Sequence, residues 1–298
     1  MASRAAVDGL LPHLLTFSLY YWFQMNITFT GGGNMATAII GGLIDGGADT
    51  RAFRVIEPFP AQQDKLVGQF PGIGIFGEAS GGAVEGADIV VLSVKPQQLR
   101  VAAQALAPYL TNVPVVMSIA AGVRLADISR WLGGFPRVVR AMPNTPALIR
   151  EGISGAFALP EADVRGRNLA QRVLGGVGEV LWVAREDLLD AMTGVSGSGP
   201  AYVLYFLEGL EQAAQELGFS KADARTLAYA TFAGTIKLAC DSELEPDMLR
   251  AQVTSKGGTT ERGIAMLEAD AVKARFVAAV KAAAERAKEL GDALGTDG

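Results

Sequence analysis

Short apolar runs alternate with longer amphipathic stretches between residue 25 and about residue 183. The runs Ile89–Leu92 and Val115–Met117 are apolar at every position, as expected for strands that are covered on both faces. Strands that alternate with helices indicate βαβ units and a mostly parallel sheet. The predicted strands are Asn26–Thr30, Phe53–Glu57, Ile73–Phe76, Asp88–Val94, Val113–Ile119, Arg137–Met142, Ser154–Ala158 and Glu179–Val183, and the helices between them include Pro96–Leu110 and Glu161–Leu174.

The last third of the chain has no strand pattern and is predicted to be helical. Apolar side chains from Val203 to Leu217 recur at spacings of three and four, which places them on one face of a helix. Gly218 is a typical helix stop, and Ser220 is a typical cap of the next helix. The further predicted helices are Lys221–Cys240, Pro246–Val253, Thr260–Glu268 and Val272–Leu290. We expect helices this apolar to bury surface against another subunit.

The pattern therefore divides the chain into an extension, residues 1–24, an α/β domain, residues 25–187, and an all-helical domain, residues 188–298. The apolar run Leu10–Phe23 is interrupted and is shorter than the roughly 20 residues that a membrane span needs. The segment also lacks the basic start and small-residue cleavage site of a secretory signal. We expect an unnatural or mis-assigned extension, with a targeting segment as the second alternative.

Composition removes several classes of protein. The chain has 26 Lys and Arg against 31 Asp and Glu and no basic run, so we expect no nucleic-acid surface. One cysteine, Cys240, excludes an internal disulfide. One histidine, His13, lies in the extension, so the rest of the chain has no Ser-His-Asp triad, His-based zinc site or histidine proton donor. We predict no metal site and no membrane partner.

A glycine-rich segment, Gly31-Gly32-Gly33-Asn34-Met35-Ala36, follows the first predicted strand and opens a helix. In a dinucleotide-binding loop Gly31 permits the tight turn, Gly33 lets the backbone approach a pyrophosphate, and Ala36 allows close helix–strand packing. The pyrophosphate would lie at the helix N-terminus, where free N–H groups favour anions. An ordinary tight turn also uses glycine, but the position after the first strand favours a cofactor loop.

Glu57 ends the second predicted strand, where an acid can accept hydrogen bonds from both hydroxyls of a cofactor ribose. A carboxylate there also repels the 2′-phosphate of NADP, so Glu57 alone favours NAD. The alternative is an exposed acid at a strand end. Small residues in Ser93–Pro96 and Ser118–Gly122 follow two further strands and leave room for a nicotinamide ring, or they are ordinary turns.

Six motifs carry a resemblance to a known family: Gly31–Ala36, Val94–Pro96, Ala120–Gly122, Met142–Pro146, Ser196–Tyr202 and Thr254–Thr260. With them, the chain from Met25 to about Leu290 resembles pyrroline-5-carboxylate reductase, the last enzyme of proline biosynthesis. The resemblance implies a Rossmann-type domain followed by an all-α dimerisation domain, NADPH or NADH as cofactor, and a cyclic imine as substrate. It also implies a cytoplasmic homodimer that assembles into a decamer.

The resemblance also implies the site residues. Thr260 hydrogen-bonds the ring nitrogen as the catalytic residue, Ser255, Gly258 and Thr259 hold the substrate carboxylate, and Glu243 is a weaker substrate-binding candidate that is equally explained as a surface acid. Without the resemblance, residues 255–260 would be equally well explained as a capped loop between helices. The expected cofactor-binding residues are Gly31, Gly33, Asn34, Met35, Ala36, Glu57, Ser80, Ser93, Val94, Lys95, Pro96, Ala120, Ala121, Gly122 and Asn144.

Two other functions are compatible with the same two-domain layout. β-Hydroxyacid and opine-type dehydrogenases use a Lys or His proton donor on the first helix of the second domain, and Tyr202–Leu217 has neither. A cofactor-binding regulator without turnover would not need the Ser255–Thr260 segment. The family substrate is a cyclic imine whose nitrogen protonates readily, so its reduction needs no strong general acid. This agrees with the absence of histidine after residue 24.

Overall fold

The computed structural model describes residues 25–295, which form two compact units. The first unit contains the residues up to Gly197 and those from Ala284 onward, and the second contains Ser198–Ala283. The units divide later than the predicted domain boundary at residues 187 and 188, because helix α8 (Leu188–Met192) packs on the sheet of the first unit. The predictions for residues 1–24, including His13, lie outside the described residues.

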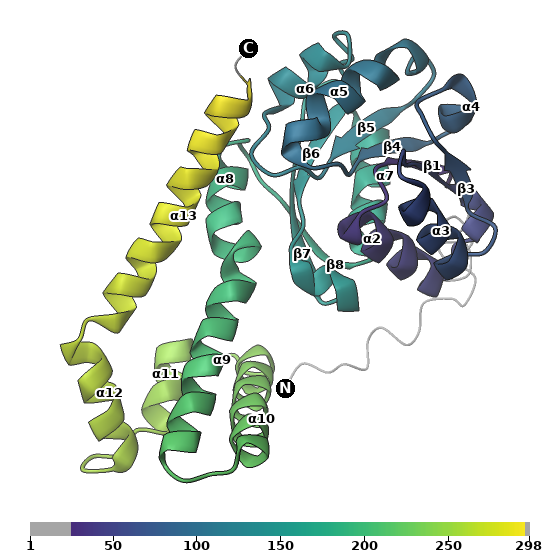
Figure 1. Ribbon diagram of the computed structural model, residues 1–298. Helices are drawn as coiled ribbons and strands as arrows, with labels where there is room; N and C mark the ends of the chain where they lie inside the picture. The colour runs from purple at the N-terminus through teal and green to yellow at the C-terminus, as the bar shows by residue number, and fades with distance from the viewer. Residues whose placement is uncertain (1–24, 296–298) are drawn as a thin grey trace, which may run out of the picture. The chain divides into compact units, whose positions relative to one another are not determined.

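An eight-stranded sheet forms the centre of the first unit, with the order β3-β2-β1-β4-β5-β6-β7-β8 (Figure 1). Every neighbouring pair is parallel except β6 and β7, which confirms the mostly parallel prediction. The order reverses between β1 and β4, where open sheets of this type bind ligands. The strands are β1 Ile27–Thr30, β2 Phe53–Ile56, β3 Gly74–Phe76, β4 Ile89–Leu92, β5 Val115–Ser118, β6 Val138–Met142, β7 Gly152–Ala158 and β8 Gly178–Trp182.

Helices cover both faces of this sheet, and each face has its own apolar core (Figure 1). Helices α2, α3 and α7 pack on one face, and α4, α5 and α6 on the other. Pro108 lies in a 3₁₀ turn, so α5 ends before the predicted Leu110. The helical elements are α2 Asn34–Asp45, η2 Thr50–Ala52, α3 Pro60–Gln69, α4 Gly81–Val84, α5 Pro96–Leu106, η3 Ala107–Tyr109, α6 Leu125–Trp131, η4 Thr145–Ile149, α7 Val164–Gly175, α8 Leu188–Met192 and η5 Thr193–Gly197.

The second unit is helical, as predicted. Its elements are α9 Gly199–Glu216, α10 Lys221–Cys240, α11 Pro246–Gln252, α12 Thr259–Ala269 and the first half of α13 Val272–Gly295. Ser220 caps α10 by accepting the Asp223 N–H at 3.2 Å, and Gly218 has a φ of 101°, as expected after a helix end. The ring of Phe276 contacts those of Tyr202 and Phe206 edge-on, which joins α13 to α9. Among the described residues, no helix is long and apolar enough to span a bilayer.

Candidate active site

A cleft of about 920 Å³ opens at the carboxyl ends of β1, β2, β4 and β5, where the strand order reverses. Its walls come from the glycine-rich turn after β1, the turns after β2, β3, β4 and β5, and one side of α5. Lys95 brings positive charge to the lining, and Glu57 and Glu78 bring negative charge. Its position and size suit an elongated dinucleotide better than a small metabolite.

The glycine-rich turn has the geometry that a bound diphosphate requires. Gly31 has a φ of 95°, and a Cβ there would lie 2.8 Å from a Val94 methyl group, so only glycine fits without strain. A Cβ on Gly33 would meet nothing within 4 Å, so its backbone is open to the cleft. No side chain caps the start of α2, which leaves the first N–H groups of that helix available to an anion. These residues fit the diphosphate of a nicotinamide dinucleotide.

Glu57 has a different first role from the predicted one. Its carboxylate is buried and accepts the Gly32 N–H at 2.9 Å through Oε2 and the Phe59 N–H at 3.1 Å through Oε1. Gln62 supports the same loop by donating to the Gly32 carbonyl at 2.6 Å. Because both carboxylate oxygens already have backbone partners, Glu57 fastens the glycine-rich turn to the end of β2, and the exposed-acid alternative is wrong.

Most of the other predicted cofactor residues line the cleft: Gly31, Gly33, Asn34, Met35, Ser93, Val94, Lys95, Pro96, Ala120 and Ala121. Ser93 also holds the turn, because its hydroxyl lies 2.8 Å from the Gly31 carbonyl and 3.0 Å from that of Thr30. Ala36 is fully buried behind the loop, as expected for close helix–strand packing. The structure therefore brings the predicted loops together at one edge of the sheet.

Besides the buried Ala36, three predicted cofactor residues are not in the lining of this cleft. Ser80 is the N-cap of α4 and accepts the Ala83 N–H at 3.4 Å. Asn144 donates to the Ser196 carbonyl at 3.1 Å and accepts the Ile153 N–H at 2.9 Å, so its amide joins backbone segments. Gly122 lies beyond Ala121 and faces the last helix. Direct contacts of Ser80, Asn144 and Gly122 with the cofactor therefore stay predictions, while the contacts seen in the structure are with the protein itself.

Gly122 instead joins the turn after β5 to the end of α13. A Cβ added to Gly291 would collide with the Gly122 carbonyl oxygen, so the two backbones approach as closely as glycine allows. Arg124 follows the same turn and donates to the Asp292 carboxylate at 2.7 Å. This hydrogen bond raises the pKa of Arg124 above its usual value, against the opposing effect of burial. The last turns of α13 therefore support the turn that contains Ala120 and Ala121.

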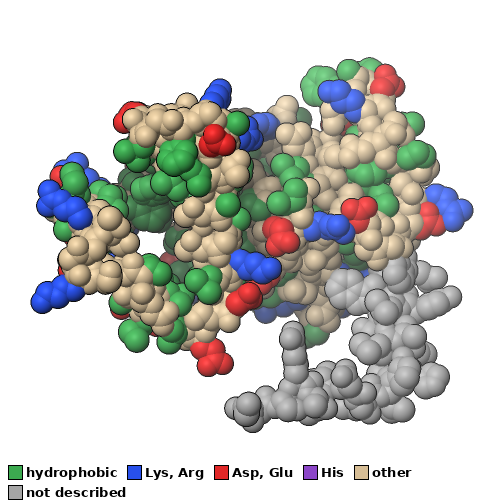
Figure 2. Space-filling view, turned by 90° about the horizontal axis from the view of Figure 1, so that it is seen from below, with side chains coloured by type: hydrophobic (Ala, Val, Ile, Leu, Met, Phe, Trp, Pro, Cys, Tyr) green, Lys and Arg blue, Asp and Glu red, His purple; other side chains and the backbone are tan. Residues whose placement is uncertain are grey.

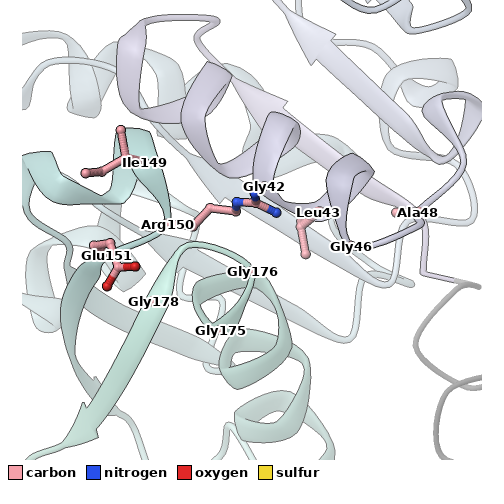
Figure 3. A pocket seen from close by; sticks show the side chains of 10 residues that line it. All are labelled: Gly42, Leu43, Gly46, Ala48, Ile149, Arg150, Glu151, Gly175, Gly176 and Gly178. Carbon is pink, nitrogen blue, oxygen red and sulfur yellow. The ribbon is translucent and has the colours of Figure 1, made fainter. Parts of the chain in front are cut away.

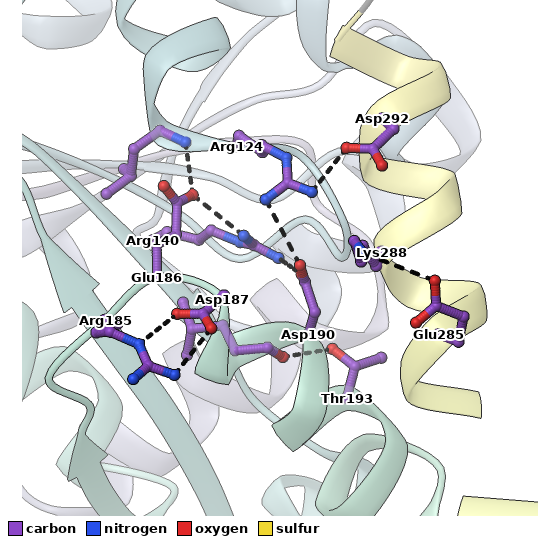
Figure 4. A network of polar contacts seen from close by, with 12 residues as sticks. Arg124, Arg140, Arg185, Glu186, Asp187, Asp190, Thr193, Glu285, Lys288 and Asp292 are labelled. Atoms are coloured by element: carbon purple, nitrogen blue, oxygen red, sulfur yellow. Dashed lines mark hydrogen bonds and ion pairs between the residues drawn. The ribbon is translucent and has the colours of Figure 1, made fainter. Parts of the chain in front are cut away.

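A buried arginine lies next to this contact (Figure 4). Arg140 on β6 is 2% exposed and donates to Asp190 at 2.6 Å and to Glu186 at 3.1 Å. Glu186 also accepts the Leu125 N–H at 2.8 Å, and Asp190 lies 3.7 Å from Arg124. The network joins β6, α8 and the start of α6, and it was not predicted from the sequence. The one available signal was a charged residue inside the apolar run of β6.

Two apolar side chains in the cleft lining were also not predicted from the sequence. Phe59 follows Glu57 after one residue and is 63% exposed, and Val101 on α5 is 72% exposed. Exposed apolar groups that line a cleft suit the faces of an aromatic base. The signal for Val101 was an apolar residue on an otherwise polar helix face.

The predicted substrate residues other than Glu243 lie in the turn before α12 and in the first turn of that helix. Gly257 has a φ of 75°, and Gly258 is the N-cap of α12 without a side-chain cap. Thr259 is the first residue of α12 rather than part of the loop, and Thr260 lies in its first turn. Glu261, which the sequence analysis did not consider, holds the turn by accepting the Gly257 N–H at 2.6 Å. Ser255, Thr259, Thr260 and Glu243 are all exposed.

A second hollow in the first unit contains none of the predicted site residues (Figure 3). It lies between the end of α2 and the turns before β7 and β8, and glycines form much of its wall. Its charged side chains, Arg150 and Glu151, are exposed, and Arg150 lies 3.8 Å from Asp45. No arrangement of groups here suggests a reaction.

Comparisons with known proteins identify both units. Residues 186–290 match the family model for pyrroline-5-carboxylate reductase dimerisation, and residues 26–122 match the model described as NADP oxidoreductase, coenzyme F420-dependent. The pyrroline-5-carboxylate reductase of Pseudomonas aeruginosa is 42% identical over 269 residues, which are 90% of this chain and 98% of that protein. That of Methanosarcina acetivorans is 38% identical over 90% of this chain and 98% of its own.

Solved structures agree with these relatives. A pyrroline-5-carboxylate reductase from Coxiella burnetii is 40% identical, with a TM-score of 0.82 over 89% of this chain and 98% of that chain. A Plasmodium falciparum pyrroline carboxylate reductase with NADP bound is 25% identical, with a TM-score of 0.80 over 90% of this chain and 100% of its own. The sheet unit, the helical unit and their order are therefore those of one enzyme family. The chain belongs to the pyrroline-5-carboxylate reductase family.

Proposed function

We propose that the protein reduces 1-pyrroline-5-carboxylate to proline with NADPH or NADH, through the residues described below. The observation that carries the proposal is the dinucleotide cleft at the strand-order reversal, in a chain that also has the Thr254–Thr260 turn. When bound, the reduced nicotinamide supplies the hydride that the imine carbon receives. The residues of this chain bind and orient the two reactants.

The first unit holds the cofactor. The open backbone at Gly33 and the uncapped start of α2 bind the diphosphate, while Glu57 and Ser93 keep the glycine-rich turn in place. Phe59 and Val101 cover the adenine, and the small residues Ala120 and Ala121 leave room for the nicotinamide end. The negative charge of Glu57 and Glu78 near the adenosine side favours NADH, or weak discrimination between the two cofactors.

The turn before α12 holds the imine. Ser255 and the N–H groups at Gly258 and Thr259 bind the substrate carboxylate at the uncapped helix start, where N–H groups attract anions. Thr260 hydrogen-bonds the ring nitrogen and so orients the C=N bond. Proton delivery needs no dedicated side chain, because the imine nitrogen accepts a proton from water. Glu243 remains the weaker candidate of this group.

Replacing the Thr260 hydroxyl tests this assignment. We expect Thr260→Ala to lower kcat/KM for the imine by about tenfold to a thousandfold, since one positioned hydrogen bond contributes a few kcal/mol to transition-state binding. The KM for the cofactor should stay within about twofold. Thr226→Ala is the matched control, because the Thr226 hydroxyl bonds the Ala222 carbonyl of its own helix at 3.0 Å. An unchanged rate for Thr260→Ala at saturating imine would contradict the role.

We further propose that the protein works in the cytoplasm and that its homodimers assemble into a decamer. Support for the dimer comes from the matched dimerisation family and the apolar helices of the second unit. The decamer and the location rest on the family resemblance. Light scattering of the purified protein gives the particle mass, and a dimer at all concentrations would contradict the decamer.

A further inference from the structure

Thr30 is the last residue of β1, directly before the glycine-rich turn. Its residue surface is 5% exposed, and its hydroxyl oxygen has no hydrogen-bond partner in the described part of the chain. Thr30 also belongs to the lining of the dinucleotide cleft. Buried hydroxyl groups are normally hydrogen-bonded, because an unpaired one has lost its bonds to water without replacement. An exception at this position calls for a partner that is absent from the polypeptide.

The neighbouring threonine shows what an ordinary buried hydroxyl does here. Thr28 is fully buried on the same face of β1, two residues earlier, and its hydroxyl donates to the Ala83 carbonyl at 2.7 Å. Ile27 and Phe29 alternate with these threonines and belong to the core on the other face. The strand therefore carries two hydroxyls on one face, of which one has a protein partner.

The surroundings of Thr30 explain why the polypeptide offers no acceptor. Ile56 on β2 and Leu92 on β4 are its partners in the two adjacent strands, and both belong to the apolar core on that face. The Thr30 carbonyl already accepts two hydrogen bonds from Ser93, one from its N–H at 2.9 Å and one from its hydroxyl at 3.0 Å. An apolar side chain would suit these neighbours better than threonine does. The hydroxyl oxygen itself has almost no accessible surface, so rotation about the Cα–Cβ bond has to turn it toward the cleft that Thr30 lines before it reaches a ligand.

We infer that Thr30 is a cofactor-binding residue whose hydroxyl donates to an oxygen of the adenosine ribose or the diphosphate of a nicotinamide dinucleotide. Thr30 ends β1 directly before the glycine-rich turn, whose backbone approaches the diphosphate in dinucleotide-binding loops, so we expect the diphosphate and the adjoining ribose beside its hydroxyl. The inference rests on the proposed cofactor binding and not on the reduction of the imine.

Isosteric valine substitutions at the two threonines separate the alternatives. Thr30→Val removes the hydroxyl and keeps the shape, so we expect the Kd for NADH and for NADPH to rise about three- to tenfold, the loss of one hydrogen bond. The melting temperature of the cofactor-free protein should stay equal or increase, because no protein hydrogen bond is lost. Thr28→Val should do the opposite: a lower melting temperature, since the Ala83 carbonyl loses its donor, and an unchanged Kd.

Two further titrations complete the test. Thr30→Ser keeps a hydroxyl and should restore the Kd to within about twofold of the original. ADP-ribose lacks the nicotinamide. The ratio of its Kd for Thr30→Val to its Kd for the original protein should equal the ratio found with NADH. If Thr30→Val leaves the Kd for NADH unchanged, the inference is overturned. If Thr30→Val weakens the binding of NADH but not of ADP-ribose, the Thr30 hydroxyl does not bind the ribose or the diphosphate. Binding is measured without imine, so either result is independent of whether the protein reduces it.

Discussion

The two units of this chain use apolar side chains in different ways. In the sheet unit, the strands bury theirs in two cores, one on each face. In the helical unit, Leu207, Ala224 and Ala228 are the buried hydrophobic residues among those described, while Tyr205 is 71% exposed and Val203 54% exposed. Apolar side chains gather on the surface of the helical unit, at the left of Figure 2.

The difference teaches that one unit completes its core within a single chain and the other does not. Exposed apolar surface of this extent on helices marks an interaction site rather than a finished fold. The matched dimerisation family agrees with this interpretation. Stability of the sheet unit should therefore depend on its own contacts, and stability of the helical unit on association.

The largest expected effect comes from breaking the buried ion pair between Arg140 and Asp190 in the sheet unit. Asp190→Ala leaves Arg140 buried without its 2.6 Å partner, and we expect a loss of about 3–5 kcal/mol in the free energy of unfolding. Asp292→Ala is the matched control, since its carboxylate is 60% exposed and such pairs contribute about 0–1 kcal/mol. Urea unfolding measures both. Equal losses of unfolding free energy in the two variants would mean that the buried pair stabilises the protein no more than the exposed pair does.

A charge on the exposed helical face tests the other half of the comparison. Tyr205→Glu should weaken association by about tenfold to a hundredfold, because an interface aromatic contributes about 1–3 kcal/mol and a buried carboxylate adds a penalty. Val164→Glu, at a side chain 75% exposed on the sheet unit, should leave association unchanged. Sedimentation equilibrium compares the two variants. If Tyr205→Glu assembles normally, this part of the face lies outside the interface.

The smallest expected effect concerns the contact between the last helix and the turn after β5. Gly291→Ala places a methyl group against the Gly122 carbonyl, which should cost about 1–3 kcal/mol and raise the KM for the cofactor more than the KM for the imine. Gly175→Ala adds a methyl group to a helix of the same unit with open space around it. Equal changes in both KM values for Gly291→Ala would argue against a role in supporting that turn.

The apolar pattern was sufficient to predict all eight strands. The clearest are β1, β4 and β5, which are buried at every position, whereas the edge strand β8 has exposed residues at alternate positions. The glycine-rich turn was also predictable, since the φ of Gly31 restricts the residue type. Roles that depend on which partner a polar atom finds were not. The amide of Asn144 and the carboxylate of Glu57 suit a cofactor in the sequence, but the fold brings backbone N–H groups to them first.

The same limit applies to the buried hydroxyls of β1 and to Arg140. Thr28 and Thr30 look equivalent in the sequence, and only the position of Ala83 on α4 separates them. Arg140 finds its acids 46 and 50 residues away, at a separation that no local pattern reveals. Some helix boundaries differ from the predicted ones for local reasons. Helix α12 begins at Thr259 and not at the predicted Thr260, because Gly258 is its N-cap.

The most direct test mixes the purified protein with 1-pyrroline-5-carboxylate and either NADH or NADPH. It follows both the absorbance of the reduced cofactor and the appearance of proline. We expect one proline for each reduced cofactor consumed, with NADH used at least as well as NADPH, or with weak discrimination between them. A protein that binds the cofactor normally but forms no proline would contradict the proposed reaction, and a large advantage for NADPH would contradict the role of the acidic adenosine side.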